Sequence, residues 1–210
     1  MHKRISALVL SGAAVALTLG LSVTSASATT AKTWTVTPGG NITGTSGTTT
    51  LKDTTTGNSL TCKSSSTSAT LKSGSGLSGT GLGSVTALSF KTCTGPLSLT
   101  FTVSVGNLPY VLSATKYKSG VTTGTISGIH ATLSGSDCSA VVDGATSGTA
   151  DNGKVTVTYT NSTGKLKVLT TGGTLHIYDV SGCLGLLNNG DVSTFSGSYT
   201  VKPKQTITES

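Results

Sequence analysis

Charged and aromatic residues are scarce in this 210-residue chain. Charged residues make up 10% and aromatic residues 4% of the sequence. The 14 Lys+Arg outnumber the 7 Asp+Glu, but the lysines stand singly and no arginine follows Arg4. Proteins that bind nucleic acid usually cluster their basic residues and interleave them with aromatic ones. The composition therefore argues against a nucleic-acid partner.

The motifs of common enzyme classes are also missing. The chain has no G-x-S-x-G, no H-E-x-x-H, no cysteine beside a histidine and no acidic loop of the form D-x-D-x-D-G. His130 and His176 fall in expected strands, on the faces opposite the aliphatic side chains, which favours solvent-facing residues over catalytic ones. An enzyme would need one of them near a carboxylate. We predict no catalytic residue, no cofactor site and no metal site.

The amino end has the pattern of a signal peptide. Lys3 and Arg4 precede a mostly apolar run over 5–21, and Ala26-Ser27-Ala28 fits the small-residue cleavage pattern. We expect a signal peptide over 1–28 and a secreted protein that is extracellular or associated with the cell surface. No later stretch is apolar for long enough to form a membrane-spanning helix.

Four cysteines in an exported chain predict two disulfides. Cys62, Cys93, Cys138 and Cys183 are too widely spaced for the Cys-x2-Cys pairs that are typical of zinc sites. Three pairings are open, and a faint internal repeat favours one of them. T-C-T-G at Cys93 resembles G-C-L-G at Cys183, and the segments after Cys62 and Cys138 are also alike. This repeat favours Cys62 to Cys93 and Cys138 to Cys183, one bridge in each of two related halves.

Alternation of apolar and hydroxyl side chains is the dominant pattern of what remains. Over 97–105, L-S-L-T-F-T-V-S-V sends every apolar side chain to one face of a strand. Similar short runs are separated by glycine and asparagine turns. The pattern predicts an all-β fold, an antiparallel β-sandwich or barrel of about ten to twelve short strands.

We expect a single β-domain over 29–201, with two related halves at about 29–115 and 116–201, and a flexible tail over 202–210. The glycine-rich segment Ser73 to Gly83 and the turn Gly106 to Pro109 are candidates for exposed binding loops. The segment Cys183 to Asn189 is compact enough for a helical turn.

The segment G-L-S-G-T-G-L-G-S-V-T-A-L-S-F-K-T-C-T-G, together with the signal peptide and the four cysteines, resembles a set of small secreted Ser/Thr/Gly-rich actinobacterial proteins of unassigned function. A weaker likeness extends to the secreted alkane-oxidation activator proteins. Neither resemblance transfers a catalytic residue to this chain.

Together these features predict a secreted, non-catalytic β-protein that acts at the cell envelope or surface as a structural or interaction protein. Its partner would be a cell-wall polymer or another surface protein. The alternative is a soluble secreted binding protein, an inhibitor or a ligand carrier, which would show a rigid loop or a pocket. A membrane-inserted β-barrel pore and a hydrolase are less favoured readings.

Overall fold

The computed structural model describes residues 32–210, so the expected signal peptide at 1–28 and its cleavage point lie outside the described residues. Those residues form fifteen β-strands and one short 3-10 helix, η1 (Pro96–Ser98), and contain no α-helix. Every strand pair is antiparallel. The prediction of an all-β fold is confirmed.

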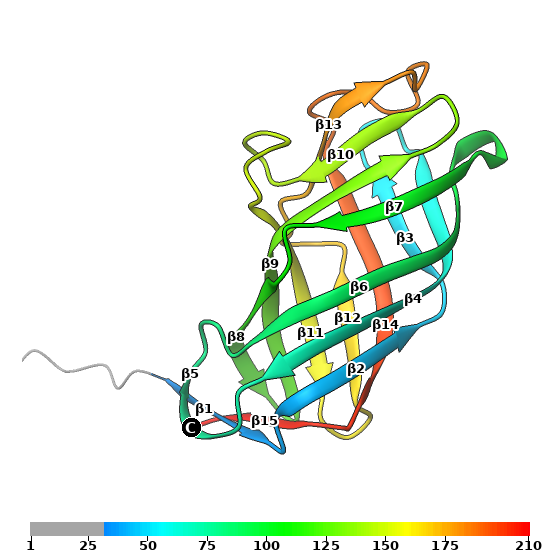
Figure 1. Ribbon diagram of the computed structural model, residues 1–210. Coiled ribbons are helices and arrows are strands. Elements are labelled where there is room, and N and C mark those ends of the chain that lie inside the picture. Colours follow the sequence, from blue (N-terminus) through cyan, green and yellow to red (C-terminus); the bar gives the residue numbers. More distant parts are fainter. Residues whose placement is uncertain (1–31) are drawn as a thin grey trace, which may run out of the picture. The chain divides into compact units, whose positions relative to one another are not determined.

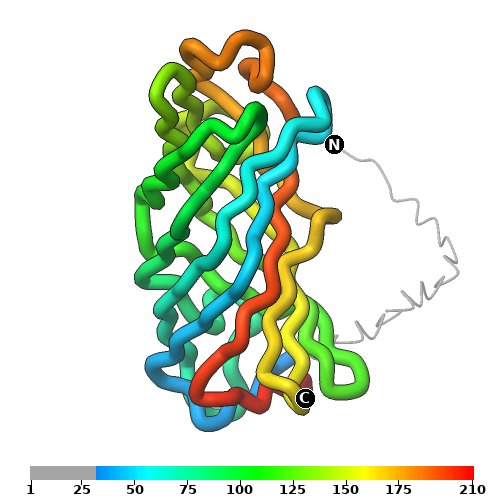
Figure 2. Tube along the Cα trace, turned by 90° about the vertical axis from the view of Figure 1, so that its right-hand side faces the viewer, coloured from blue at the N-terminus to red at the C-terminus, as the bar shows by residue number. Residues whose placement is uncertain are grey.

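The wall of the fold is a sheet that closes on itself, so the structure is a barrel and not a sandwich (Figures 1 and 2). The wall has eight strand positions. Each of four positions is filled by a single strand, and each of the other four is filled by two successive strands that continue each other. In chain order they are β2 (Gly40–Ser46) with β3 (Thr49–Asp53), β4 (Ser59–Leu71), β6 (Gly83–Thr94), β7 (Thr100–Gly106) with β8 (Tyr110–Lys118), β9 (Val121–Ser134), β10 (Ser139–Asp143) with β11 (Gly153–Thr160), β12 (Lys165–Leu169) with β13 (His176–Ser181), and β14 (Ser193–Lys202).

Each position pairs with the next one along the chain, and β14 returns to pair with β2 and β3. This is the up-and-down order of eight-stranded barrels, whose closure removes the unpaired sheet edges. The expected halves at 29–115 and 116–201 each supply four neighbouring positions. They share one barrel, because β8 pairs with β9 where the halves meet.

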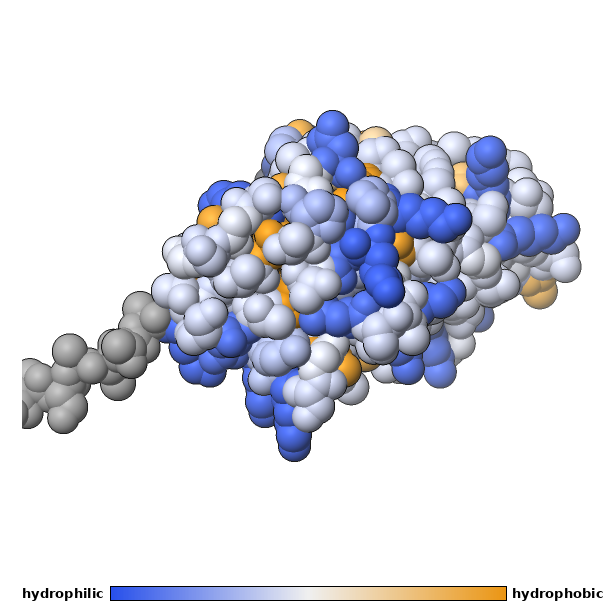
Figure 3. Space-filling view, turned by 90° about the horizontal axis from the view of Figure 1, so that it is seen from below, coloured by the Kyte–Doolittle hydropathy of each residue, from blue (hydrophilic) through white to orange (hydrophobic). Residues whose placement is uncertain are grey.

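A small second sheet lies at the lower end of the barrel in Figure 1. It consists of β1 (Thr33–Thr37) between β5 (Gly74–Ser78) and β15 (Thr206–Glu209). Trp34 and Val36 of β1 are buried, with exposures of 2% and 0%, against apolar residues from the barrel and from β15. Seen from below, this face has intermediate hydropathy with scattered hydrophilic residues and small hydrophobic spots (Figure 3).

This sheet corrects two predictions. The tail over 202–210 is not flexible, because β15 pairs with β1 and buries Ile207. The sequence argument missed it because only one apolar residue in this segment marks the strand. The segment Ser73 to Gly83 is not a free loop, because β5 lies within it and pairs with β1. Its glycine content concealed a strand that is defined by its partner and not by its own side chains.

The expected strand over 97–105 starts later than predicted. It begins at Thr100, whereas Leu97 is 81% exposed and lies in η1. Leu97 has a φ of 55° and Pro96 lacks a backbone donor, so this corner cannot join the sheet ladder. The segment Cys183 to Asn189 forms turns, not the expected helical turn.

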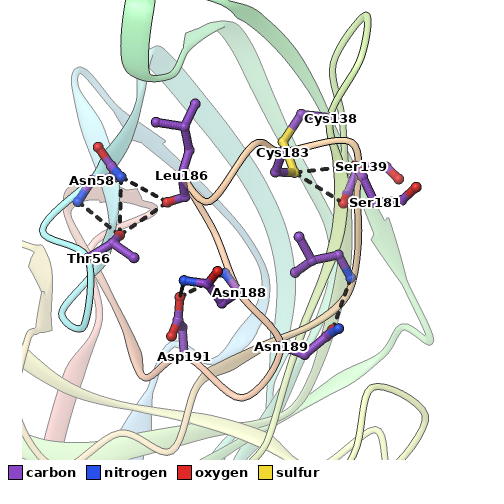
Figure 4. The surroundings of a disulfide bond; sticks show 11 residues. Thr56, Asn58, Cys138, Ser139, Ser181, Cys183, Leu186, Asn188, Asn189 and Asp191 are labelled. Atoms are coloured by element: carbon purple, nitrogen blue, oxygen red, sulfur yellow. Dashed lines mark hydrogen bonds between the residues drawn. A yellow bond between two sulfur atoms is a disulfide. The ribbon is translucent and has the colours of Figure 1, made fainter.

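Both disulfides form in the predicted pairing. Cys62 and Cys93 lie directly opposite each other on β4 and β6. Cys138 precedes β10 and Cys183 follows β13, so the second bridge joins the outer ends of two paired strands (Figure 4). The bridges close loops of 31 and 45 residues, and each contributes about 4 kcal/mol by the loop-entropy model.

Candidate binding cavity

The interior of the barrel contains an apolar cavity of about 140 Å³. Strand alternation produces its lining, because every second side chain of a barrel strand points inward. Each of the eight strand positions contributes to the wall. The larger side chains that face the cavity include Ile42, Leu88, Phe90, Leu112, Ile126, Ile129, Leu166 and Phe195.

These inward side chains are incompletely packed. All eight are only half-buried although they belong to the apolar wall of the cavity. Phe90 and Phe195 contact each other edge to face, with ring centroids 5.8 Å apart, and both border the empty space. A protein interior is normally filled to the density of an organic crystal. The centre of this barrel therefore has room that its own side chains do not occupy.

Few polar groups lie at the cavity wall: two tyrosine hydroxyls are engaged by the protein, whereas the buried Thr49 hydroxyl has no hydrogen-bond partner among the described residues. The Tyr199 hydroxyl accepts a hydrogen bond from the Ser65 hydroxyl, and the Tyr110 hydroxyl donates to the backbone oxygen of His130. Burial raises the pKa of both tyrosines, which keeps them neutral. The cavity therefore offers an occupant mainly dispersion contacts and exclusion from water.

A second cavity of about 70 Å³ lies toward the lower end. It shares Ile42, Leu112, Leu166 and Val201 with the first, so the two spaces are neighbours along the barrel interior. Its floor is more polar. The Tyr159 hydroxyl donates to the backbone oxygen of Gln205 and accepts from the Gln205 N–H.

An external groove of about 580 Å³ runs beside this wall. Ile42 and Ala69 border both the groove and the larger cavity. The register of β4 against β6 shifts between Ser68 and Ala69. The groove and the cavity therefore approach each other near a register shift in the wall.

His130 is not the isolated, solvent-facing residue that the sequence predicted. Its Nδ1 lies 3.0 Å from Asp143 Oδ2 and 3.3 Å from Asp151 Oδ1. The contact arises because β9 carries His130 between two interrupted strand positions, whose breaks follow β7 and β10. The sequence shows Asp143 and Asp151 near this strand, but alternation of apolar and polar residues could not predict that they face His130.

Asp143 is completely buried and receives several donors. Its carboxylate accepts hydrogen bonds from the N–H groups of Gly144, Asp151 and Asn152. Burial would raise the pKa of Asp143, but the His130 hydrogen bond and these N–H groups lower it below the ordinary value of 3.8. The carboxylate therefore stays ionised and holds His130 in place.

The His130 cluster has the donor types of a metal site, since one ligand atom from each of His130, Asp143 and Asp151 lies within 4.8 Å of the others. Its groups are already satisfied by protein donors, and the hydrogen bond from Asn107 to Asp151 completes the set. Within residues 32–210, no serine, threonine or cysteine side chain forms a hydrogen bond with His130 Nε2, so the histidine has no nucleophile to activate. We interpret the cluster as a structural clamp across the two breaks.

The other predicted candidates show no comparable arrangement. His176 Nδ1 faces the backbone oxygen of Thr174, and the ring stacks on Tyr178 with centroids 6.3 Å apart. The turn Gly106 to Pro109 holds Asn107, whose side chain belongs to the His130 cluster. The four cysteines serve as disulfides, and within the described residues none is free.

Comparisons with protein-family models, with curated proteins and with solved structures find no match for this chain. Among residues 32–210, no helix has the length and apolar character needed to span a membrane. The barrel and its cavity are therefore the features on which a functional argument can rest.

Proposed function

We propose that this protein is a non-catalytic binding protein that holds a small apolar ligand inside the barrel. The observation that carries the proposal is the 140 Å³ apolar cavity at the centre of the closed wall. Eight-stranded barrels have an interior that side chains either fill or leave open for one small ligand. This interior is of the second kind.

An unfilled cavity of this size is energetically unfavourable. At about 24 cal/mol per Å³, leaving it empty costs about 3 kcal/mol relative to a filled core. Leucine in place of Ala69 or Ala131 would supply the missing volume without changing the alternation. The presence of small residues at these inward positions supports a role for the empty space.

The cavity also defines the ligand class. An engineered cavity of about 150 Å³ with aliphatic and aromatic walls admits benzene. The present cavity is similar in volume and lining, and its tyrosine hydroxyls are engaged elsewhere. The ligand is a single aromatic ring or a short hydrocarbon chain, and a longer chain would extend into the neighbouring 70 Å³ space.

This proposal favours a ligand carrier over an envelope protein, because a carrier requires a pocket. Two disulfides are typical of exported proteins and support action outside the cell. Secretion, association with the envelope and the absence of catalysis stay predictions.

Fluorobenzene titrated into the purified, disulfide-bonded protein and followed by ¹⁹F NMR tests the proposal. We expect a shifted or broadened resonance that saturates at one ligand per protein. Ala131→Leu fills the cavity and should abolish the effect without loss of stability. Ala87→Leu makes the same change on the outer face of β6, where the residue is exposed, and should bind normally.

Two results would overturn the proposal. One is the absence of any saturable effect in the natural protein at ligand concentrations up to its solubility. The other is equal binding by the Ala131→Leu and Ala87→Leu variants, which would place the ligand outside the barrel interior.

A further inference from the structure

Three buried polar side chains meet where β3 ends and β14 begins. Asp53 is the last residue of β3 and lies directly opposite Ser193, the first residue of β14. Asp191 precedes Ser193 by two residues, so its side chain points to the same face of the extended chain. The exposures of Asp53, Asp191 and Ser193 are 2%, 7% and 4%.

Two of these groups lack a partner within the described residues. Asp53 Oδ1 accepts hydrogen bonds from the N–H groups of Thr55 and Thr56, but Asp53 Oδ2 has none. The Ser193 hydroxyl is likewise buried without a partner. Buried polar atoms are nearly always hydrogen-bonded or bound to an ion, so two orphan oxygens side by side indicate a missing ligand.

The two carboxylates also lack a counter-charge. Among residues 32–210, no lysine lies within ion-pair distance of Asp53 or Asp191. Burial would raise the pKa of Asp53, but the hydrogen bonds from Thr56 and Thr55 and the neighbouring Asp191 carboxyl group lower it. The two carboxyl groups are therefore close enough to interact, and adjacent buried carboxylates require a proton or a cation between them.

We propose that Asp53, Asp191 and Ser193 bind a calcium ion. The available ligand atoms are all oxygens, which hard divalent cations prefer, and Ca²⁺ tolerates irregular sites better than Mg²⁺. Asp191 Oδ2 is held by the backbone and side-chain N–H groups of Asn188, which fixes the direction of that carboxylate (Figure 4). Asp191 is the least buried of the three residues, at 7% exposure, so the ion would enter from its side.

The ion would tie together two turns that already interlock. Asn58 and Thr56 donate side-chain hydrogen bonds to the backbone oxygen of Leu186 (Figure 4). Thr54 donates its backbone N–H and its hydroxyl to the backbone oxygen of Val192. Calcium at Asp53, Asp191 and Ser193 therefore stabilises the upper end of the barrel and leaves the apolar cavity unchanged.

Isothermal titration of the EDTA-treated protein with CaCl₂ tests the site directly. We expect one ion per protein. The midpoint of thermal unfolding should rise by roughly 5–10 °C at a calcium concentration of 100 times the dissociation constant. Fluorobenzene binding should be the same with calcium and with EDTA, which separates this site from the cavity.

Variants locate the ion. Asp53→Asn and Ser193→Ala should weaken calcium binding at least tenfold, and Asp151→Asn in the His130 cluster should leave it unchanged. The Ser193→Ala variant removes only one hydroxyl, so it keeps the test valid if Asp53→Asn does not fold. No calcium heat in the natural protein would show that the carboxyl groups share a proton instead. Equal weakening by Asp151→Asn would place the ion at the His130 cluster, and either result overturns the proposal.

Discussion

The two ends of the barrel are closed in different ways. At the lower end, a three-stranded sheet places Trp34, Val36 and Ile207 against apolar residues of the wall. At the upper end, turns are joined by side-chain hydrogen bonds and by the Cys138–Cys183 bridge. The lower end is held by packing, whereas the upper end is held by polar and covalent links.

The difference has a physical consequence for stability. Packing of apolar area depends on every neighbouring side chain, so the loss of one large residue affects the whole lower end. Hydrogen bonds and a disulfide act at defined points, so the upper end can lose one of them and keep the others. The sole tryptophan lies in the lower end, which makes its fluorescence a local reporter of that end.

The largest effect is expected from Trp34→Ala. Removing this 2%-exposed side chain should lower the free energy of unfolding by about 4 kcal/mol, because large-to-small changes of buried aromatics leave a cavity. Denaturant unfolding followed by circular dichroism measures it. Trp34→Phe is the matched control and should lose less. A loss under about 1 kcal/mol would mean that the lower sheet does not contribute to global stability.

The double change Cys138→Ala and Cys183→Ala should cost up to about 4 kcal/mol, because the bridge restricts a long loop of the unfolded chain. The emission of Trp34 in the folded state should stay unchanged, since the two cysteines flank β10 and β13, which lie at the opposite end (Figure 1). A shift of that emission before unfolding would show that the two ends are coupled.

Gln205→Leu should cost about 2 kcal/mol at the lower end. The Gln205 side-chain oxygen accepts the N–H of Gly39, and its amide donates to the backbone oxygen of Pro203. Leucine fills the volume but leaves a buried N–H unpaired. Comparison of its midpoint with that of Trp34→Phe would show whether polar contacts matter at an end held mainly by packing.

The smallest expected effect is a change of stability with pH, caused by Asp143, whose pKa is lowered in the folded protein. Its ionised form contributes stability above the unfolded pKa of about 4, and this contribution is lost as the pH falls through the lower folded pKa. The thermal midpoint should therefore be flat between pH 5 and 7 and fall below about pH 4. Asp143→Asn should flatten the acid branch, and an unchanged branch would contradict the assignment.

Much of the fold follows from local patterns in the sequence. Alternation over 153–160 places Val155, Val157 and Tyr159 on the buried face, as the structure shows. The internal repeat around the cysteines also led to the observed bridges. Strands that depend on their partners were missed, because β5 and β15 carry few apolar side chains of their own.

The candidate sites were not predictable in the same way. His130 and Asp143 are 13 residues apart and meet because β9 pairs with β10. Asp53 and Ser193 are far apart in the chain and become neighbours only when the last wall strand returns to the first. No local pattern records a contact of that kind.

The sequence by itself determined which side chains face inward and where the chain turns, because these depend on periods of two residues and on local turn chemistry. For the cysteines, the internal repeat only favoured the pairing that forms. Only the tertiary structure decided that the sheet closes, that its interior keeps a 140 Å³ cavity and that the buried Asp53 lies opposite Ser193. Closure depends on the register and tilt of all the wall strands together, and the space left inside depends on how opposite walls meet.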